Sequence, residues 1–357
     1  MVEILLATFN GGKFLKQQLN SLQNQTYNQW KLIVFDDGST DDTLKILNDF
    51  RNKSSNKVEI HLNASGAARG PLKNFNALIL VSKADYVAFC DQDDVWLPTK
   101  LEHSFNFLKN LEKNFGNLPI LVHSDLIIAD ENLNVVRNSM IRTQKFNYSS
   151  NKTIAQLLVQ NCVTGCTMFA NRALLKLCGN ISQEAIMHDW WLALLACAFG
   201  KLEFLDEATI YYRQHGGNTV GVVPIDLTSD EIKKNSENVV KQPKKKNSFF
   251  NKLFLQNFKF RKFYKLFSVF FWYHFTCNVW KIYKRRKTVR KNLHDTFFQG
   301  RAFLRQYRRI LSVEQKKIIR TYCSLFVGCK LKRVFNLMGS GYLKSGFLRK
   351  LAQIFYI

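Results

Sequence analysis

The chain of 357 residues is 46% hydrophobic and 22% charged, a composition that excludes a largely disordered protein. Its formal net charge is +25, yet residues 1–221 hold 21 basic and 21 acidic residues, so the whole excess lies beyond Gly221. These numbers predict a neutral globular body followed by a basic C-terminal region. The chain opens without a secretory leader pattern and has no apolar run of about 18 residues, so we expect a cytoplasmic protein with reduced cysteines.

Strand and helix signals alternate over the first 90 residues. Apolar runs predict strands at Ile4–Thr8, Trp30–Phe35, Val58–Leu62 and Tyr86–Cys90. Amphipathic spacing predicts helices between them at Phe14–Leu22, Thr40–Phe50 and Asn74–Ser82. This alternation is typical of an α/β fold, with a mostly parallel sheet and helices on both of its faces.

The pattern changes after Gly116. We expect strands at Ile120–Ser124, Asp125–Ala129, Cys162–Ala170, Leu202–Leu205 and Ala208–Tyr212, and helices at Thr153–Val159 and His188–Phe199. Residues 222–248 have the composition of a linker, and residues 249–357 are typical of basic, aromatic-rich helices. Within that region Ser312 and Gln315 predict a capping box that opens a helix reaching about Phe326.

Polar clusters follow three of the first four predicted strands. They are Thr8–Asn10, Asp36–Ser39 and Asp91–Asp94. Because ligands of α/β sheets bind beyond the carboxyl ends of the strands, we expect the three clusters to form one site.

The cluster Asp91-Gln92-Asp93-Asp94 is the sharpest chemical signal. Carboxylates on one turn repel each other unless a cation or donors neutralise them, and a hard divalent ion such as Mg²⁺ with phosphate oxygens fits such a site. The alternative is a helix N-cap by Asp93 or Asp94, although a cap does not need three carboxylates. At the second strand end, an Asp could accept hydrogen bonds from a nucleotide, or an Asx turn could cap the next helix.

With these motifs in view, the sequence resembles family 2 glycosyltransferases of the GT-A fold, which have a Rossmann-like nucleotide-binding sheet. The matching stretches are Ala7–Asn10, Leu22–Tyr27, Val34–Asp41 and Asp91–Pro98. Met187–Trp191 and Tyr212–Gly216 are similar to bacterial rhamnosyltransferases of surface-polysaccharide (O-antigen type) synthesis, and so is the ending Gly341–Phe355.

The resemblance implies an inverting hexosyltransferase that uses Mg²⁺ or Mn²⁺. Its donor would be a nucleotide sugar, with dTDP-L-rhamnose favoured and UDP-glucose or UDP-galactose as the alternative, and its acceptor a lipid-linked saccharide. The QxxRW motif of processive synthases is absent from the sequence, so we expect one sugar per acceptor encounter.

The resemblance also implies roles for single residues. The nucleotide-sugar ligands would be Thr8, Asn10, Asp37, Lys73, Asp91 and Arg213. The metal ligands would be Asp93, Asp91 and His215. The Arg69–Leu72 stretch before Lys73 departs from the shorter loop expected of the family. The alternative for Arg213 and His215 is that they are ordinary polar residues on the protein surface.

Asp189 falls where the family places its general base. An inverting transferase needs a base to deprotonate the acceptor hydroxyl, and partial burial at the head of an apolar helix would raise the pKa of Asp189 into a useful range. Its neighbours His188 and Trp190 would lie on the acceptor side, with simple packing as the alternative for His188.

Two other functions are compatible with parts of the sequence. A basic, aromatic C-terminal region is also typical of a nucleic-acid-binding protein, but the acidic strand ends would repel phosphates without a metal, so we expect no nucleic acid partner. A nucleotidyltransferase would share the metal and the paired Asp residues, but no Gly-rich loop with a Lys or Arg follows the first strand.

Basic and bulky apolar residues alternate in the C-terminal region, as in Phe260–Phe267. This mixture is typical of a segment that lies on an anionic membrane surface without crossing it. We therefore expect a peripheral protein of the inner face of the cytoplasmic membrane. The alternative is a helical tail that packs its aromatic side chains on the body and leaves its charges in water.

Overall fold

The computed structural model of the chain describes residues 1–63, 68–144, 153–218, 298–316 and 318–320. All of them fall in one compact unit, in which residues of the C-terminal region join the N-terminal body. The structure of this unit explains where the predicted site lies.

Within the described residues, nine strands form one mixed sheet. They are β1 (Val2–Thr8), β2 (Trp30–Asp36), β3 (Val58–Leu62), β4 (Tyr86–Cys90), β5 (Val95–Trp96), β6 (Ile120–Ala129), β7 (Val135–Arg137), β8 (Phe169–Asn171) and β9 (Lys201–Arg213). Their order is β3-β2-β1-β4-β8-β6-β9-β5, and β7 pairs with β6. Strands β1 to β4 run parallel, whereas β8 runs antiparallel to both β4 and β6. The parallel half therefore directs the carboxyl ends of β1, β2 and β4 to one edge.

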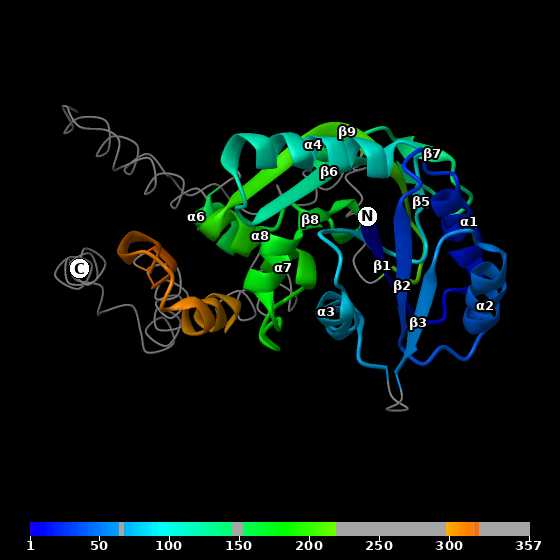
Figure 1. Cartoon of the computed structure of the whole chain (residues 1–357), viewed down its shortest axis with the longest axis horizontal. Coiled ribbons are helices and arrows are strands. Elements are labelled where there is room, and N and C mark those ends of the chain that lie inside the picture. Colours follow the sequence, from blue (N-terminus) through cyan, green and yellow to red (C-terminus); the bar gives the residue numbers. More distant parts are fainter. Residues whose placement is uncertain (64–67, 145–152, 219–297, 317, 321–357) are drawn as a thin grey trace, which may run out of the picture. The chain divides into compact units, whose positions relative to one another are not determined.

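Helices cover both faces of this sheet. They are α1 (Gly12–Gln23), α2 (Thr43–Lys53), α3 (Pro71–Val81), α4 (Lys100–Phe115), α5 (Met140–Gln144), α6 (Ile154–Val159), α7 (Arg172–Cys178) and α8 (His188–Phe199). Figure 1 shows α1 and α2 on one side of β1, β2 and β3, and α3 on the other. Helix α8 packs against α3, α6 and α7. The strands between these layers are buried nearly from end to end, which explains their continuous apolar runs.

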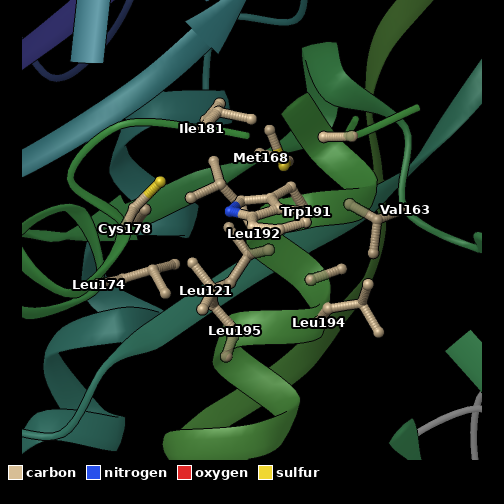
Figure 2. Close-up of a cluster of buried hydrophobic side chains, with 14 of the residues drawn as sticks. Leu121, Val163, Met168, Leu174, Cys178, Ile181, Trp191, Leu192, Leu194 and Leu195 are labelled. Carbon is tan, nitrogen blue, oxygen red and sulfur yellow. The ribbon is translucent and has the colours of Figure 1, made fainter. Parts of the chain in front are cut away.

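The largest buried cluster surrounds Trp191 of α8. Figure 2 shows its indole among Ile181, Leu192 and Met168, with Leu174 and Cys178 of α7 nearby. Trp191 is fully buried, so α8 is held against the sheet by its apolar face. This packing places the first residues of α8 close to the end of β4.

The C-terminal region contributes to the same core. A helix spans residues 298–307, and its Phe303 and Tyr307 rings lie 5.4 and 6.0 Å from the Trp191 ring. The predicted capping box is confirmed, because the Ser312 N–H donates to Gln315 Oε1 (2.8 Å) and the Gln315 N–H donates to Ser312 Oγ (3.1 Å). The described part of the region thus packs its aromatic side chains on the body, while Phe260–Phe267, Gly341–Phe355 and the predicted linker lie outside the described residues. In the described ranges, no helix combines the length and the apolar character that a membrane span needs.

Most predicted elements of the first 90 residues are confirmed with small shifts at their ends. The predicted strand at Cys162–Ala170 is wrong, because a loop and a 3₁₀ turn (Gly165–Thr167) precede β8, which begins only at Phe169. Gly165 passes so close to α8 that a Cβ there would lie 2.9 Å from the His188 imidazole Nε2, so the absence of a side chain allows this approach. The split strands predicted at 120–129 and 202–212 are single strands, β6 and β9, whose pairing shifts register near Asp125.

A buried carboxylate fixes the opposite end of β1. Glu3 accepts hydrogen bonds from Ser82 Oγ (2.6 Å) and from the N–H groups of Lys83 (2.9 Å) and Ala84 (3.1 Å), and Lys31 Nζ lies 3.4 Å away. Burial alone would raise the pKa of Glu3, but these donors and the Lys31 charge together lower it below its usual value. Glu3 therefore stabilises the folded chain in its ionised form.

We expect Glu3→Gln to lower the free energy of unfolding at pH 7 by about 1–3 kcal/mol, because the buried donors lose their charged acceptor. A lowered carboxyl pKa contributes stability above the unfolded pKa and loses it as the pH falls through the folded value, so the difference should shrink toward pH 3. Urea unfolding of the wild type and of Glu3→Gln at pH 7 and at pH 3 measures this difference in the free energy of unfolding. The exposed Glu314→Gln serves as the control. An equal loss at both values would contradict the role of the Glu3 charge.

Candidate active site

The three polar clusters meet at one edge of the sheet, as predicted. Thr8 Oγ1 donates to Asp36 Oδ2 (2.7 Å), and the Asn10 N–H donates to Ser39 Oγ (2.8 Å). Gln92 joins the third strand end to the first, since the Phe9 N–H donates to Gln92 Oε1 (2.9 Å) and Gln92 Nε2 donates to the Phe9 carbonyl (3.0 Å). These reciprocal bonds connect the ends of β1, β2 and β4 into one surface.

Asp37 lies at the end of β2 and holds the chain that follows β3. Its Oδ1 accepts from Asn63 Nδ2 (2.9 Å), and its Oδ2 accepts from the N–H groups of Arg69 (2.7 Å) and Gly70 (2.8 Å). The Arg69 guanidinium lies over the Phe35 ring at 4.6 Å. Asp37 therefore shapes the wall of the site. Lys73 is exposed on the first turn of α3, and its proposed contact with the diphosphate stays a prediction.

A carboxylate cluster forms the floor of the site at the end of β4. Ligand atoms of Asp91, Asp94 and Cys166 all lie within 4.8 Å of one another. Burial raises the pKa of Asp91 to about 7, and the charges of Asp93 and Asp189 add to this effect. Burial, together with Asp93 and Asp91, raises the pKa of Asp94 well above its usual range.

The cluster fits a divalent cation. The buried Oδ2 of Asp94 accepts no hydrogen bond within the described residues. Repelling carboxylates with a spare oxygen are what a hard cation stabilises, because Mg²⁺ and Mn²⁺ prefer oxygen ligands. The sequence analysis placed Asp91 and Asp93 at the metal but missed the nearness of Asp94 to Cys166, which depends on the 3₁₀ turn before β8.

His215 joins Asp93 at the mouth of the cluster. Its Nε2 lies 2.8 Å from Asp93 Oδ2, and its Nδ1 accepts from the Gly217 N–H (3.1 Å). A neutral imidazole accepting at Nδ1 carries its proton on Nε2, so His215 donates to Asp93. The structure thus brings together two of the three predicted metal ligands by direct contact.

Arg213, at the end of β9, is buried against the turn that carries Asp93. Its Nε donates to the Asp93 carbonyl (2.7 Å) and its Nη2 to Gln17 Oε1 (2.6 Å). Its guanidinium also lies over the Phe14 ring at 4.6 Å, and only 1% of Arg213 is exposed. These contacts position the metal-binding turn, and binding of the diphosphate by Arg213 stays a prediction.

Asp189 lies in the first turn of α8 and faces the carboxylate cluster. Burial raises the pKa of Asp189 to about 7, although hydrogen bonds from the Trp190 and Gly165 N–H groups and the Asn161 side chain oppose this. Its charge is one of the causes that raise the pKa of Asp91, so the two carboxylates are electrostatic neighbours. A carboxylate with this pKa can accept a proton near neutral pH.

The two neighbours of Asp189 make packing contacts. The His188 ring stacks on Phe75 with centroids 3.9 Å apart, and burial lowers the pKa of His188 to about 3, so it stays neutral. Trp190 Nε1 donates to the Leu157 carbonyl and ties α8 to α6. These contacts favour the packing alternative for His188, and an acceptor contact by either residue stays a prediction.

The C-terminal segment supports α8 at both ends, a role that the sequence analysis missed. The Ile186 N–H, three residues before Asp189, donates to Oε1 of the buried Gln299 (2.7 Å). At the other end, Gln315 Nε2 donates to the Ala198 carbonyl (2.6 Å). The helix that carries the candidate base is therefore clamped by residues far along the chain.

The mixed α/β sheet with a carboxylate cluster at its strand ends, and a further carboxylate on a facing helix, agrees with the GT-A fold that the sequence predicts. Residues 3–177, just under half of the chain, match the family model described as glycosyl transferase family 2.

Named relatives carry the comparison further. The chain is 28% identical over 227 residues to the dTDP-rhamnosyl transferase RfbG of Shigella flexneri, covering 60% of this chain and 73% of that protein. It is 27% identical over 179 residues to the UDP-Glc:alpha-D-GlcNAc-diphosphoundecaprenol beta-1,3-glucosyltransferase WfgD of Escherichia coli, covering 49% of this chain and 62% of that protein. The match thus spans less than two thirds of WfgD.

A solved structure agrees in fold. S. aureus TarS 1-349 in complex with UDP-GlcNAc has a TM-score of 0.50 and 18% identity, and covers 92% of this chain and 91% of that one. At this identity the likeness shows the fold alone.

Proposed function

We propose that the chain is an inverting, metal-dependent transferase that moves a hexose from a nucleotide sugar to a lipid-linked saccharide in surface-polysaccharide synthesis. The observation that carries this proposal is that Asp189 on α8 faces the Asp91 cluster, where burial first, and then the charges of Asp93 and Asp189, raise the pKa of Asp91. The carboxylates at the strand ends would hold the metal and the diphosphate. Asp189, on α8, would accept the proton of the acceptor hydroxyl. The names of RfbG, a dTDP-rhamnosyl transferase, and of WfgD, which acts on a diphosphoundecaprenol-linked sugar, support a nucleotide-sugar donor and a lipid-linked acceptor.

The chemistry follows from this arrangement. The acceptor hydroxyl attacks the anomeric carbon, its proton passes to Asp189, and the bond from the anomeric carbon to the diphosphate oxygen breaks. A bound Mg²⁺ or Mn²⁺ would be held by Asp91 and Asp93, with the Asp93 carboxylate oriented by its hydrogen bond from His215, and would neutralise charge on the leaving diphosphate. Arg213 keeps the Asp93 turn in place throughout, because its guanidinium is already bonded to that backbone.

The pH dependence of the reaction should report the state of Asp189. A base acts only when it is deprotonated, and the pKa of Asp189 is raised to about 7. We therefore expect kcat/KM to rise as the pH increases through about 7 and to fall about tenfold per unit on the acid side. A rate that stays constant between pH 5 and pH 8 would contradict a base with a raised pKa.

The donor is tested by binding and transfer with a panel of nucleotide sugars. We expect dTDP-L-rhamnose to bind most tightly, with Mn²⁺ strengthening binding. The alternatives are UDP-glucose, which is the donor in the name of WfgD, and UDP-galactose. The sugar, and not the nucleotide, should appear on the acceptor, which separates this reaction from nucleotidyl transfer. Transfer of the nucleotide to the acceptor with release of the sugar 1-phosphate would favour the nucleotidyltransferase.

We also propose that the enzyme associates peripherally with the inner face of the cytoplasmic membrane through its basic C-terminal region. The +25 charge excess beyond Gly221 supports this, since each basic residue near an anionic surface contributes about 1 kcal/mol. The full chain should float with phosphatidylglycerol vesicles at low salt and detach at high salt, while phosphatidylcholine vesicles serve as the control. Equal flotation with both kinds of vesicle would contradict electrostatic attachment.

A further inference from the structure

A basic groove lies on the C-terminal segment, between the helix at 298–307 and the helical residues 313–316 and 318–320. Its volume is about 400 Å³. The residues that line it are Arg301, Leu304, Arg305, Arg308, Lys316 and Arg320. Five of these six side chains are cationic, so the groove concentrates positive charge in a concave surface.

The spacing of the cations explains how they share one surface. Arg301 and Arg305 are four residues apart and therefore lie on one face of the helix, and Arg308 directly follows the last helical residue. Arg305 pairs with Glu184 at 2.7 Å. Arg308, Lys316 and Arg320 make no ion pair within the described part of the chain. Most of the positive charge is thus left to an external anion.

The opposite face of the same helix is firmly anchored. Ala302, Phe303 and Tyr307 are buried in the core around Trp191, and the Tyr307 hydroxyl donates to the Cys178 carbonyl (3.2 Å). The three arginines are therefore presented by a fixed element, which lowers the cost of ordering them around a ligand.

Apolar side chains are exposed next to the cations. Ile310 is 55% and Val313 83% exposed, in the turn that joins the two helical stretches. A ligand that combines a multiply charged phosphate group with an apolar chain would contact both features. A soluble phosphate would use only the arginines and lysine.

We propose that this groove binds the diphosphate group of a membrane lipid, and the proposal rests on the lipid-linked acceptor of the proposed function. A diphosphate carries more charge on one group than the single phosphate of a bilayer phospholipid, and guanidinium groups bind phosphate oxygens in pairs. The first turn of the same helix contains Gln299, whose side chain accepts from the Ile186 N–H, three residues before Asp189. The groove would therefore capture the acceptor by its lipid-proximal end on the element that also supports the base.

Vesicle binding by the full chain tests the groove. Phosphatidylcholine vesicles would contain either undecaprenyl diphosphate or enough phosphatidylglycerol to give the same surface charge. The wild type should bind the diphosphate vesicles at least about tenfold more tightly, since each basic contact with an anionic lipid contributes about fivefold. The double variant Arg308→Glu with Arg320→Glu should lose this preference, and inorganic diphosphate alone should compete only weakly.

The matched control is Arg309→Glu with Lys113→Glu, two exposed basic residues that do not line the groove, because it makes the same change in charge. It should keep the preference. Equal wild-type affinity for the two kinds of vesicle, or a preference that survives in the groove variant, would overturn the proposal. Strong competition by inorganic diphosphate would show a site for free phosphate and overturn the lipid assignment. Nucleotide-sugar binding should be the same in the wild type, the groove variant and the control variant. If none of the three proteins bound a nucleotide sugar, the transferase proposal would be refuted, whereas the vesicle result for the groove would still stand.

Discussion

Asp189→Asn should reduce turnover by about 10²–10⁴-fold, the range typical of general-base catalysis, while donor affinity stays nearly constant. The amide keeps the shape of the side chain but cannot accept the acceptor proton. It can still accept hydrogen bonds from the Trp190 and Gly165 N–H groups, so α8 should keep its first turn. Single-turnover transfer and equilibrium binding of the nucleotide sugar measure the two quantities separately.

The control for Asp189 is Asp49→Asn on the exposed surface of α2, which should have wild-type turnover. In Asp189→Asn the acid limb of the pH profile near pH 7 should also disappear. If donor binding fell as strongly as turnover, Asp189 would belong to the nucleotide site and another group would have to be the base.

Asp93→Ala should abolish Mn²⁺-dependent binding of the nucleotide sugar and, with it, transfer. The variant removes one carboxylate from the cluster and leaves His215 Nε2 without its partner at 2.8 Å. Because Asp93 is one of the charges that raise the pKa values of Asp91 and Asp94, its loss should relieve repulsion and leave the fold intact. Calorimetric titration with and without Mn²⁺, together with the melting temperature, measures both expectations.

Asp42→Ala is the matched control for Asp93, since Asp42 is an exposed carboxylate before α2 and is not one of the clustered carboxylates. It should bind the nucleotide sugar with an unchanged requirement for Mn²⁺. Full activity of Asp93→Ala would remove Asp93 from the metal site, whereas a large fall in its melting temperature would mean that the carboxylate is structural.

The sequence predicted the edge of the sheet well because local signals determine it. Each polar cluster directly follows a strand, and parallel strands bring their carboxyl ends together, so Thr8, Asp36 and Gln92 had to meet. Asp189 was found differently, because the resemblance to family 2 glycosyltransferases implied the general base there, and its place at the head of an apolar helix predicted only the raised pKa. The raised pKa values near 7 then follow from burial, which the apolar neighbours already implied.

Other features depend on contacts between distant segments and could not be predicted. Arg213 has the chemistry of a phosphate ligand, and only the fold shows that its guanidinium bonds to the Asp93 backbone. His188 has the chemistry of a catalytic residue, but its stacking on Phe75 keeps it neutral. The hydrogen bond from the Ile186 N–H to Gln299 joins residues that are 113 positions apart, and no local sequence pattern predicts it.

The support of α8 by residues 298–320 also affects what happens when the backbone is cut. Part of the wall around Trp191 comes from Phe303 and Tyr307, which follow β9 only after residues 219–297. One proteolytic cut within 219–297 would leave two fragments that still share this buried interface, so they should co-purify and retain the Asp189 environment. A chain that stops at residue 221 would expose one side of Trp191 and lose the Gln299 bond, and it should recover when the missing fragment is added in trans.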